Sequence, residues 1–162
     1  MGIERRTKVT ESCKELVRSA LFAPGGPYTT DEITVVDALP GDEFKGKLDI
    51  TYVAAGSSFD DGGRQGEAGS DLVRYVWTIE YMVLAPAATW GKNVADTVAS
   101  AFDIGENIPL LAIGTTRAPT GETAIVTYSQ AQRVIVRAPR PWEQFVWMTR
   151  VKLEDYFYAS QP

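Results

Sequence analysis

The chain has 162 residues, of which 44% are hydrophobic and 23% charged, and its formal net charge is −5. This length suits one domain with a sizeable core, and the composition excludes wholesale disorder. The acidic balance argues against a nucleic-acid coat protein, which normally needs a basic face.

Targeting segments and disulfides bear on where the protein is made. The first residues lack the apolar region of a signal peptide, and no apolar run reaches the ~18 residues of a membrane span. Cys13 is the only cysteine, so no disulfide can form within the chain. We therefore expect a soluble protein, without a membrane partner, that is made in a reducing cytoplasm.

The first expected element is a helix that runs from residue 3 or 4 to residue 22. Its apolar positions recur at the spacing of one helix face: Val9, Cys13, Leu16, Val17, Ala20 and Leu21. The segment Pro-Gly-Gly-Pro at residues 24–27 should end the helix. Because Cys13 lies on the apolar stripe, we interpret it as a core residue rather than a nucleophile.

Two β-prone segments follow at residues 33–36 and 48–54, and then a glycine-rich stretch at residues 56–70. The stretch holds five glycines and few apolar residues, so burial cannot offset the entropy of ordering it. It lacks the Gly-Lys-Ser/Thr of a P-loop, and Asp60 and Asp61 are adjacent rather than alternating as in an EF-hand. We predict a mobile loop between two antiparallel strands, with an ion or phosphate site as the alternative.

Residues 72–102 form the centre of the predicted domain. Residues 72–84 alternate with period two and are rich in β-branched and aromatic side chains, which indicates one long strand with Trp77, Ile79 and Tyr81 on one face. After Pro86 the period changes, and residues 89–102 show a helical stripe that ends at Phe102. Thr89 is the expected N-cap of this helix.

The rest of the chain adds strands to the same sheet. Residues 108–113 could pair at a sheet edge, a turn is expected at residues 119–121, and residues 125–128 and 132–137 are β-prone. Residues 144–154 alternate cleanly, with residues 155–162 as a short tail. The sequence therefore predicts a single α+β domain over residues 1–162. Its mainly antiparallel sheet of five or six strands should carry the N-terminal helix and the central helix.

The sequence offers little catalytic chemistry, because it contains no histidine. Histidine triads and the commonest zinc sites are therefore excluded. The pairs Asp42-Glu43, Asp60-Asp61 and Glu154-Asp155 sit in predicted loops or at a strand end, where we interpret them as solvated. Trp90 and Gly91 could grip a ligand, but we favour packing of the strand-to-helix turn. We assign no catalytic, cofactor-binding or metal-binding residue and expect a protein that is not an enzyme.

A known family shares this order of elements and several short motifs. The strand carries R-x-x-W-x-I-x-x-x-V, the turn carries Pro86 and Gly91, and the helix carries A-D-x-V-A-S-x-F from Ala95 to Phe102. This layout resembles the tail-terminator, or tail-completion, proteins of long-tailed bacteriophages over most of residues 1–158. The chain departs from the family pattern at Trp77, where glycine is usual, and in the longer segment 104–121.

The resemblance implies a structural virion protein of the tail or neck. Its subunits would form a homo-oligomeric ring, in that family a hexamer, which caps the head-proximal end of the tail tube. The implied partners are the tail tube protein and a head-completion or connector protein, with DNA passing through the ring without specific binding. The alternatives are a head-completion stopper, another neck or tube protein, and, from a different class, a small-molecule-binding or carboxylate-dependent hydrolytic domain.

Assembly surfaces are expected on the long strands, whose second face is not polar and needs more cover than two helices supply. The glycine-rich stretch is a second candidate surface, because loops of its length are often functional. Our candidate assembly-interface residues are Phe59, Asp60, Asp61, Arg64, Val76, Met82, Leu84, Val146 and Met148.

Overall fold

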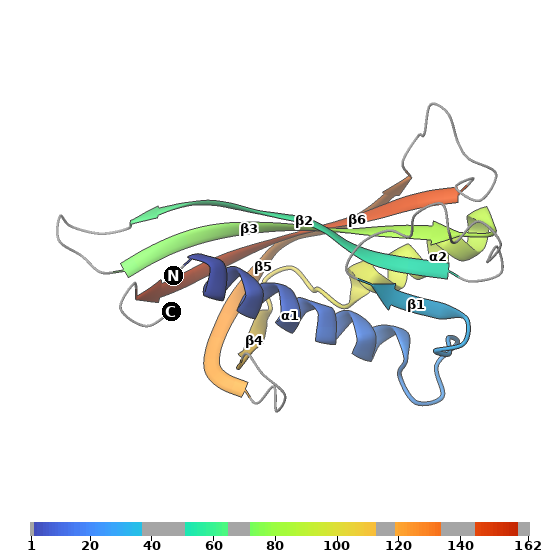
Figure 1. Cartoon of the computed structure of the whole chain (residues 1–162), viewed down its shortest axis with the longest axis horizontal. Coiled ribbons are helices and arrows are strands. Elements are labelled where there is room, and N and C mark those ends of the chain that lie inside the picture. The colour runs from blue at the N-terminus through green and yellow to red at the C-terminus, as the bar shows by residue number, and fades with distance from the viewer. Residues whose placement is uncertain (1, 37–50, 65–71, 113–118, 134–144, 159–162) are drawn as a thin grey trace.

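The computed structural model describes residues 2–36, 51–64, 72–112, 119–133 and 145–158. These residues form two helices and six strands (Figure 1). In chain order the elements are α1 (Gly2–Leu21), β1 (Ile33–Val36), β2 (Thr51–Arg64), β3 (Leu72–Ala85), α2 (Ala88–Ser100), β4 (Asn107–Leu111), β5 (Pro119–Arg133) and β6 (Phe145–Tyr158). Neither described helix is long and apolar enough to cross a membrane.

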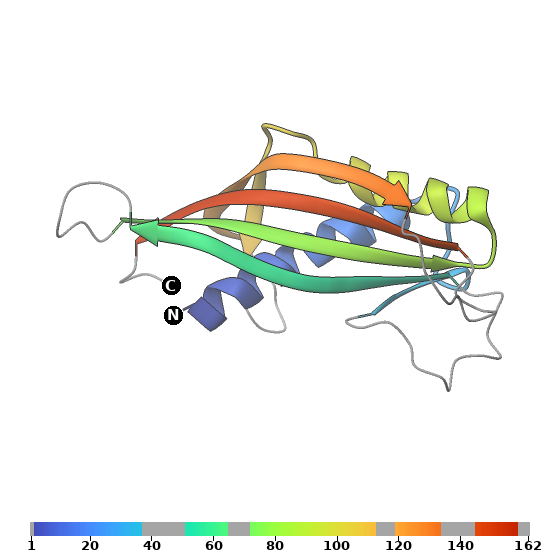
Figure 2. The same cartoon turned by 90° about the horizontal axis from the view of Figure 1, so that it is seen from above.

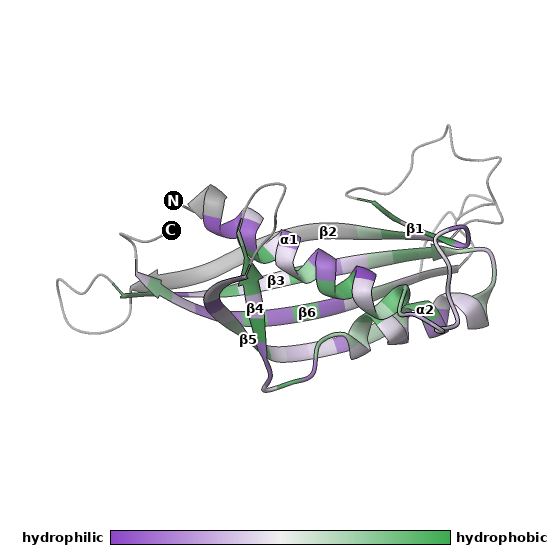
Figure 3. Cartoon of the chain, turned by 90° about the horizontal axis from the view of Figure 1, so that it is seen from below, coloured by the Kyte–Doolittle hydropathy of each residue, from purple (hydrophilic) through white to green (hydrophobic). Residues whose placement is uncertain are grey.

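The six strands form one sheet in the order β1-β2-β3-β6-β5-β4. The pair β1 and β2 is parallel, and the other neighbours are antiparallel. Both helices and β4 lie on one side of the long strands (Figure 3), and the opposite view shows those strands with no helix in front of them (Figure 2). The expected α+β class is confirmed, with a mixed sheet because of the parallel β1.

Strand β3 is the centre of the sheet, as its alternation predicts. Trp77, Ile79, Tyr81 and Val83 are buried on the helix side. Their partners across the ladder with β6 are Leu153, Val151, Thr149 and Trp147. At about 3.3 Å per residue, the 14 residues of β3 span about 46 Å. This length exceeds that of either helix, so the sheet sets the long axis of the subunit (Figure 1).

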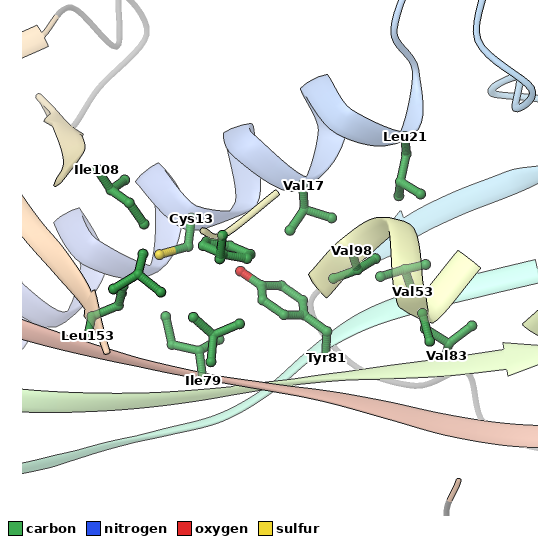
Figure 4. Close-up of a cluster of buried hydrophobic side chains, with 14 of the residues drawn as sticks. Cys13, Val17, Leu21, Val53, Ile79, Tyr81, Val83, Val98, Ile108 and Leu153 are labelled. Carbon is green, nitrogen blue, oxygen red and sulfur yellow. The ribbon is translucent and has the colours of Figure 1, made fainter. Parts of the chain in front are cut away.

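Helix α1 packs its apolar stripe on this sheet. Val9, Cys13, Val17 and Leu21 lie four residues apart and are at most 1% exposed. Figure 4 shows Cys13 and Val17 beside Tyr81, with the hydroxyl of Tyr81 directed toward the helix. The interpretation of Cys13 as a core residue is confirmed.

Helix α2 runs from Ala88 to Ser100 where residues 89–102 were expected, and its N-cap is Ala87 rather than Thr89. Ala87 has extended dihedrals and makes no capping bond with its side chain. The first turn of α2 also packs closely on the sheet, because a Cβ at Gly91 would lie 3.0 Å from the Ala85 Cβ and 3.0 Å from the Trp147 Cδ1. Trp90 packs edge-on against Tyr28 and donates a hydrogen bond to Thr51 Oγ1 at 2.7 Å, so this turn is packed as we favoured.

The glycine-rich stretch differs from its prediction. Residues 56–64 belong to β2 and pair antiparallel with β3 down to Arg64 opposite Val73, with an irregular register between Ala55 and Ser58. The backbone bonds of an adjacent long strand supply order that the composition of this stretch does not reveal. Residues 65–70 lie outside the described part of the chain.

Two further boundaries are corrected. The turn expected at residues 119–121 lies within β5, where Gly121 has a φ of +83°. The segments expected separately at residues 125–128 and from residue 132 belong to this one strand, which is described through Arg133. An irregular register between Val126 and Tyr128 accounts for the break in alternation. At the C-terminus β6 continues to Tyr158, so residues 155–158 are strand rather than tail.

Candidate assembly surface

The face of the sheet that the helices leave uncovered is the candidate functional surface, which we call the open face. Successive side chains of a strand point to opposite sides of the sheet. Because Trp77, Ile79 and Tyr81 are buried on the helix side, the even-numbered residues of β3 lie on the open face. Cross-strand pairing then places residues of β6 and β5 on the same face. The described members of the open face, including two from β2, are Tyr52, Ala54, Leu72, Arg74, Val76, Thr78, Glu80, Met82, Leu84, Ile125, Tyr128, Gln130, Gln132, Met148, Arg150, Lys152, Glu154, Tyr156 and Tyr158.

The middle of the open face is a ladder of charges. Glu80 accepts a hydrogen bond at 3.1 Å from Nε of its cross-strand partner Arg150, and Nη2 of the same arginine forms an ion pair with it at 2.9 Å. Arg74 forms an ion pair with Glu154. Hydrogen bonds from Tyr156 and from Arg74 hold the pKa of Glu154 below its ordinary value. The ladder supplies partners for its own charges, as cross-strand pairs commonly do.

One end of the open face is apolar and exposed. Ile125, Tyr156 and Tyr158 are 37%, 46% and 55% exposed. Ile125 is the cross-strand partner of Glu154, and Tyr156 donates a hydrogen bond to the same carboxylate at 2.6 Å. Tyrosine and apolar side chains around a satisfied polar centre are typical of protein–protein contact surfaces.

The sequence-predicted residues on the open face are divided between surface and interior. Val76 and Met82 are half-buried, whereas Leu84 and Met148 are 5% and 7% exposed within the subunit itself. Val146 is the register partner of Leu84, and its side chain lies outside the described part of the chain. The apolar character that suggested an interface is thus partly used in the packing of the subunit.

The candidates from the glycine-rich stretch occupy ladder positions of β2. Phe59, Asp60 and Asp61 pair with Thr78, Trp77 and Val76, and Arg64 pairs with Val73. Their side chains lie outside the described part of the chain, so their role in assembly stays a prediction.

Sequence reasoning missed the exposed residues Ile125, Tyr156 and Tyr158. A signal was present, because Tyr156 and Tyr158 continue the parity of Lys152 and Glu154. Ending the strand at Glu154 concealed it. The exposure of Ile125 depends on the strand that pairs with β5, and the local sequence pattern does not identify that strand.

On the helix side, the same end of β6 holds a buried ionic cluster. Arg5 binds both carboxylate oxygens of Asp155, at 2.8 Å from Nε and 2.6 Å from Nη2, and both side chains are fully buried. Trp77 Nε1 donates to the same carboxylate at 3.0 Å. The guanidinium also lies 4.5 Å from the centre of the Phe157 ring. The interpretation of Asp155 as solvated is wrong, because β6 continues past Glu154 and turns Asp155 inward.

Glu122 completes the cluster from β5. It accepts hydrogen bonds from Arg5 at 2.6 Å and from Lys8 at 3.2 Å. Burial alone would raise the pKa of Glu122, but these two cations outweigh it and hold that pKa below its ordinary value. Burial would likewise lower the pKa of Arg5, but Asp155 and Glu122 hold it above its ordinary value. The cluster therefore stays charged and joins α1 to β5 and β6.

One of the other carboxylate pairs can be placed on the sheet. Asp60 and Asp61 in β2 are the register partners of Trp77 and Val76 in β3, whereas Asp42 and Glu43 lie outside the described residues. Among the described residues, no group of three or more histidine, cysteine, aspartate or glutamate side chains could hold a metal ion.

No protein-family model and no curated protein matches the chain. Among solved structures, a similar chain belongs to "Virion of native gene transfer agent (GTA) particle", with a TM-score of 0.47 and 15% sequence identity over 93% of this chain and 95% of that chain. A TM-score below 0.5 marks only a loose likeness between the two chains.

Proposed function

We propose that this protein is a structural subunit of a phage-like virion. In this proposal it assembles into a homo-oligomeric ring, with six subunits, that caps the head-proximal end of the tail tube and joins the tail to the neck. The observation that carries the proposal is the open face, a broad surface of long strands with tyrosines exposed at one end. Surfaces of this kind are used for protein contact rather than for small-molecule chemistry.

The family resemblance supplies the specific role, and the positions of its motif residues support it. The motif strand is β3, the turn with Pro86 and Gly91 leads directly into α2, and the motif helix buries Ala95, Val98 and the following Phe102. The residues that carry the resemblance therefore belong to one packed unit at the centre of the subunit.

A ring of this kind would work by geometry. A tail tube grows by a contact that joins different surfaces of successive layers, and such a stack ends when a layer lacks the surface for the next one. One side of the ring would bind the tube, and the other would present a different surface to the neck. The net charge of −5 suits a channel that DNA crosses without adhering.

We propose further that the protein works without turnover. Glu154 and Asp155, the adjacent carboxylates at the end of β6, lie on opposite faces of the sheet, and each is paired with its own arginine. Acid–base catalysis by two carboxylates needs both at one substrate. This arrangement favours a structural role over the carboxylate-dependent alternative.

The test is polymerisation of the cognate tube protein with and without this chain, measured by electron microscopy of tube lengths and ends. We expect shorter tubes that carry a ring at one end. The double variant Tyr156→Ser, Tyr158→Ser should lose much of this effect, whereas Asn93→Ala on the exposed side of α2 should retain it. Tubes of unchanged length with no ring at either end would refute the terminator role. Binding to the head portal alone would instead support the stopper alternative.

A further inference from the structure

The large apolar side chains exposed in the described part of the chain gather around one strand. Ile125, Tyr156 and Tyr158 share one end of the open face, and Ile104, at 67% exposure, lies on the turn after α2. That turn is attached to β5 by two backbone hydrogen bonds, from Gly105 N to Val126 O at 2.8 Å and from Val126 N to Glu106 O at 3.0 Å. Single exposed apolar residues need no explanation, but a group around one strand does.

The turn is held in a defined shape. Glu106 N donates to Asp103 O at 3.1 Å across it, and Gly105 has a φ of +89°, which a residue with a side chain rarely adopts. These bonds hold the backbone of Ile104 so that its side chain extends into solvent between Asp103 and Glu106, which are both exposed. The turn is therefore a preformed apolar knob with acidic flanks, and binding it would cost little ordering entropy.

The open face has the opposite charge character. In the Arg150–Glu80 pair the arginine side chain is 40% exposed and the glutamate 22%, and in the Arg74–Glu154 pair the arginine is again the more exposed. Lys152 is exposed between these pairs, with its ammonium 5.8 Å from the centre of the Tyr128 ring. The chain as a whole has a net charge of −5, yet among the described side chains of the open face the outermost charges are cationic, and its exposed large apolar groups are Ile125 and the tyrosines.

We propose that the open face receives the Asp103–Glu106 turn of a second copy of this chain. Ile104 would contact Ile125, Tyr156 and Tyr158 of the neighbouring subunit, and Asp103 and Glu106 would face its Lys152 and Arg150. The apolar contact contributes the affinity. The complementary charges fix how the two subunits are oriented and disfavour contacts between surfaces of like charge. The contact rests on the proposed function, because it joins two different surfaces, as successive subunits of a ring require.

Charge reversal on each surface tests the contact. The variants Glu106→Lys and Lys152→Glu and their combination are compared by sedimentation velocity over a range of protein concentrations. Each single reversal should raise the concentration needed for assembly at least tenfold, and the combination should return it to within about threefold of the unmodified chain. Ile104→Ser should also raise it at least tenfold. Lys92→Glu on α2, a reversal away from both surfaces, should leave it unchanged.

All the altered residues are exposed, so each variant should fold like the unmodified chain. Circular dichroism and denaturant midpoints check this. A chain that stays monomeric at every concentration would overturn the inference. Single reversals that leave the concentration needed for assembly unchanged would also overturn it. So would a double variant that needs as high a concentration as the more impaired single variant. The tube assay separates this inference from the proposed function. Normal rings that leave tube length unchanged would refute only the terminator role, and capping unaffected by the reversals would refute only the contact.

Discussion

Arg5 holds a full positive charge inside the subunit, where an unpaired ion would cost several kcal/mol. Two hydrogen bonds to Asp155, one to Glu122 and the ring of Phe157 surround it. The cluster ties the first turns of α1 to the last residues of β6, which are 150 positions away in sequence. Along β6, Asp155 and Phe157 face this cluster while Tyr156 and Tyr158 face outward, so the buried ion pair holds the strand end that carries the exposed tyrosines.

Removing one member of this pair should be costly. We expect Asp155→Ala to lower the free energy of unfolding by about 3–5 kcal/mol, because Arg5 is left buried without its main partner. The double variant Arg5→Met, Asp155→Leu should recover at least half of that loss, because no isolated charge remains. Urea denaturation followed by tryptophan fluorescence measures both. Asp155→Ala with unchanged stability would show that water reaches Arg5.

Cys13 provides a second test at the scale of one residue. Its thiol is fully buried on α1, and burial raises its pKa well above the ordinary value. Because the thiolate is the reactive form, the folded protein should not react with a thiol reagent at pH 8, whereas the unfolded protein should react with one equivalent. Rapid labelling without denaturant would contradict the packing of α1 on Tyr81.

At the scale of elements, the contact between α2 and the sheet depends on a glycine, three aromatic residues and backbone carbonyls. Gly91 allows the first turn of α2 to approach Trp147. Ser129 and Thr149 donate hydrogen bonds to the carbonyl oxygens of Ala99 and Ala95 at 2.7 and 2.9 Å. At the far end Phe102 stacks on Tyr81, with ring centres 6.1 Å apart. The helix is thus held along its whole length by contacts with three strands of the sheet.

Phe102 tests this contact. It is almost fully buried, so Phe102→Ala should lower the free energy of unfolding by about 3–5 kcal/mol through lost burial and the cavity left behind. Ile104→Ala, two residues further on and exposed, should change it by no more than about 0.5 kcal/mol. Thermal or urea denaturation of the two variants gives the comparison. Equal effects would mean that α2 is not seated as described.

The behaviour of the whole molecule in acid follows from its paired carboxylates. Glu122 and Glu154 have pKa values below the ordinary 4.5, because cations and a tyrosine hydroxyl stabilise their charged forms in the folded state. Folding therefore favours the ionised forms. The stability they contribute is present above pH 4.5 and is lost as the pH falls through the lower pKa values of the folded protein.

We accordingly expect the urea midpoint to fall as the pH is lowered from 6 to 3. In Glu122→Gln, which has no charge to lose at this position, the fall should be smaller. Glu106→Gln, on the exposed turn, serves as the matched control and should behave like the unmodified chain. A midpoint that rises toward pH 3 would show that the net negative charge dominates the acid response instead.

Much of the architecture could be predicted from local pattern. The stripe of Val9, Cys13 and Val17 predicted α1, and the alternation of residues 72–84 predicted β3 together with the side that faces the core. Both succeeded because one face of each element is buried, and burial on one face imposes the period of the element on the sequence. The α+β class followed from the same periods.

The tertiary structure alone decided where the surfaces lie. Residues 56–64 became strand because β3 lies beside them, and Asp155 became a buried ion because Arg5 reaches it from the other end of the chain. On the same face of the sheet, Leu84 and Met148 are buried within the subunit while Ile125 and Tyr158 are exposed. Period and composition act over a few residues, whereas the exposure of a side chain and the partner of a charge depend on neighbours distant in sequence. For this protein the sequence by itself determined the central elements, such as α1 and β3, with their buried faces, and only the folded chain determined the surface available to a partner.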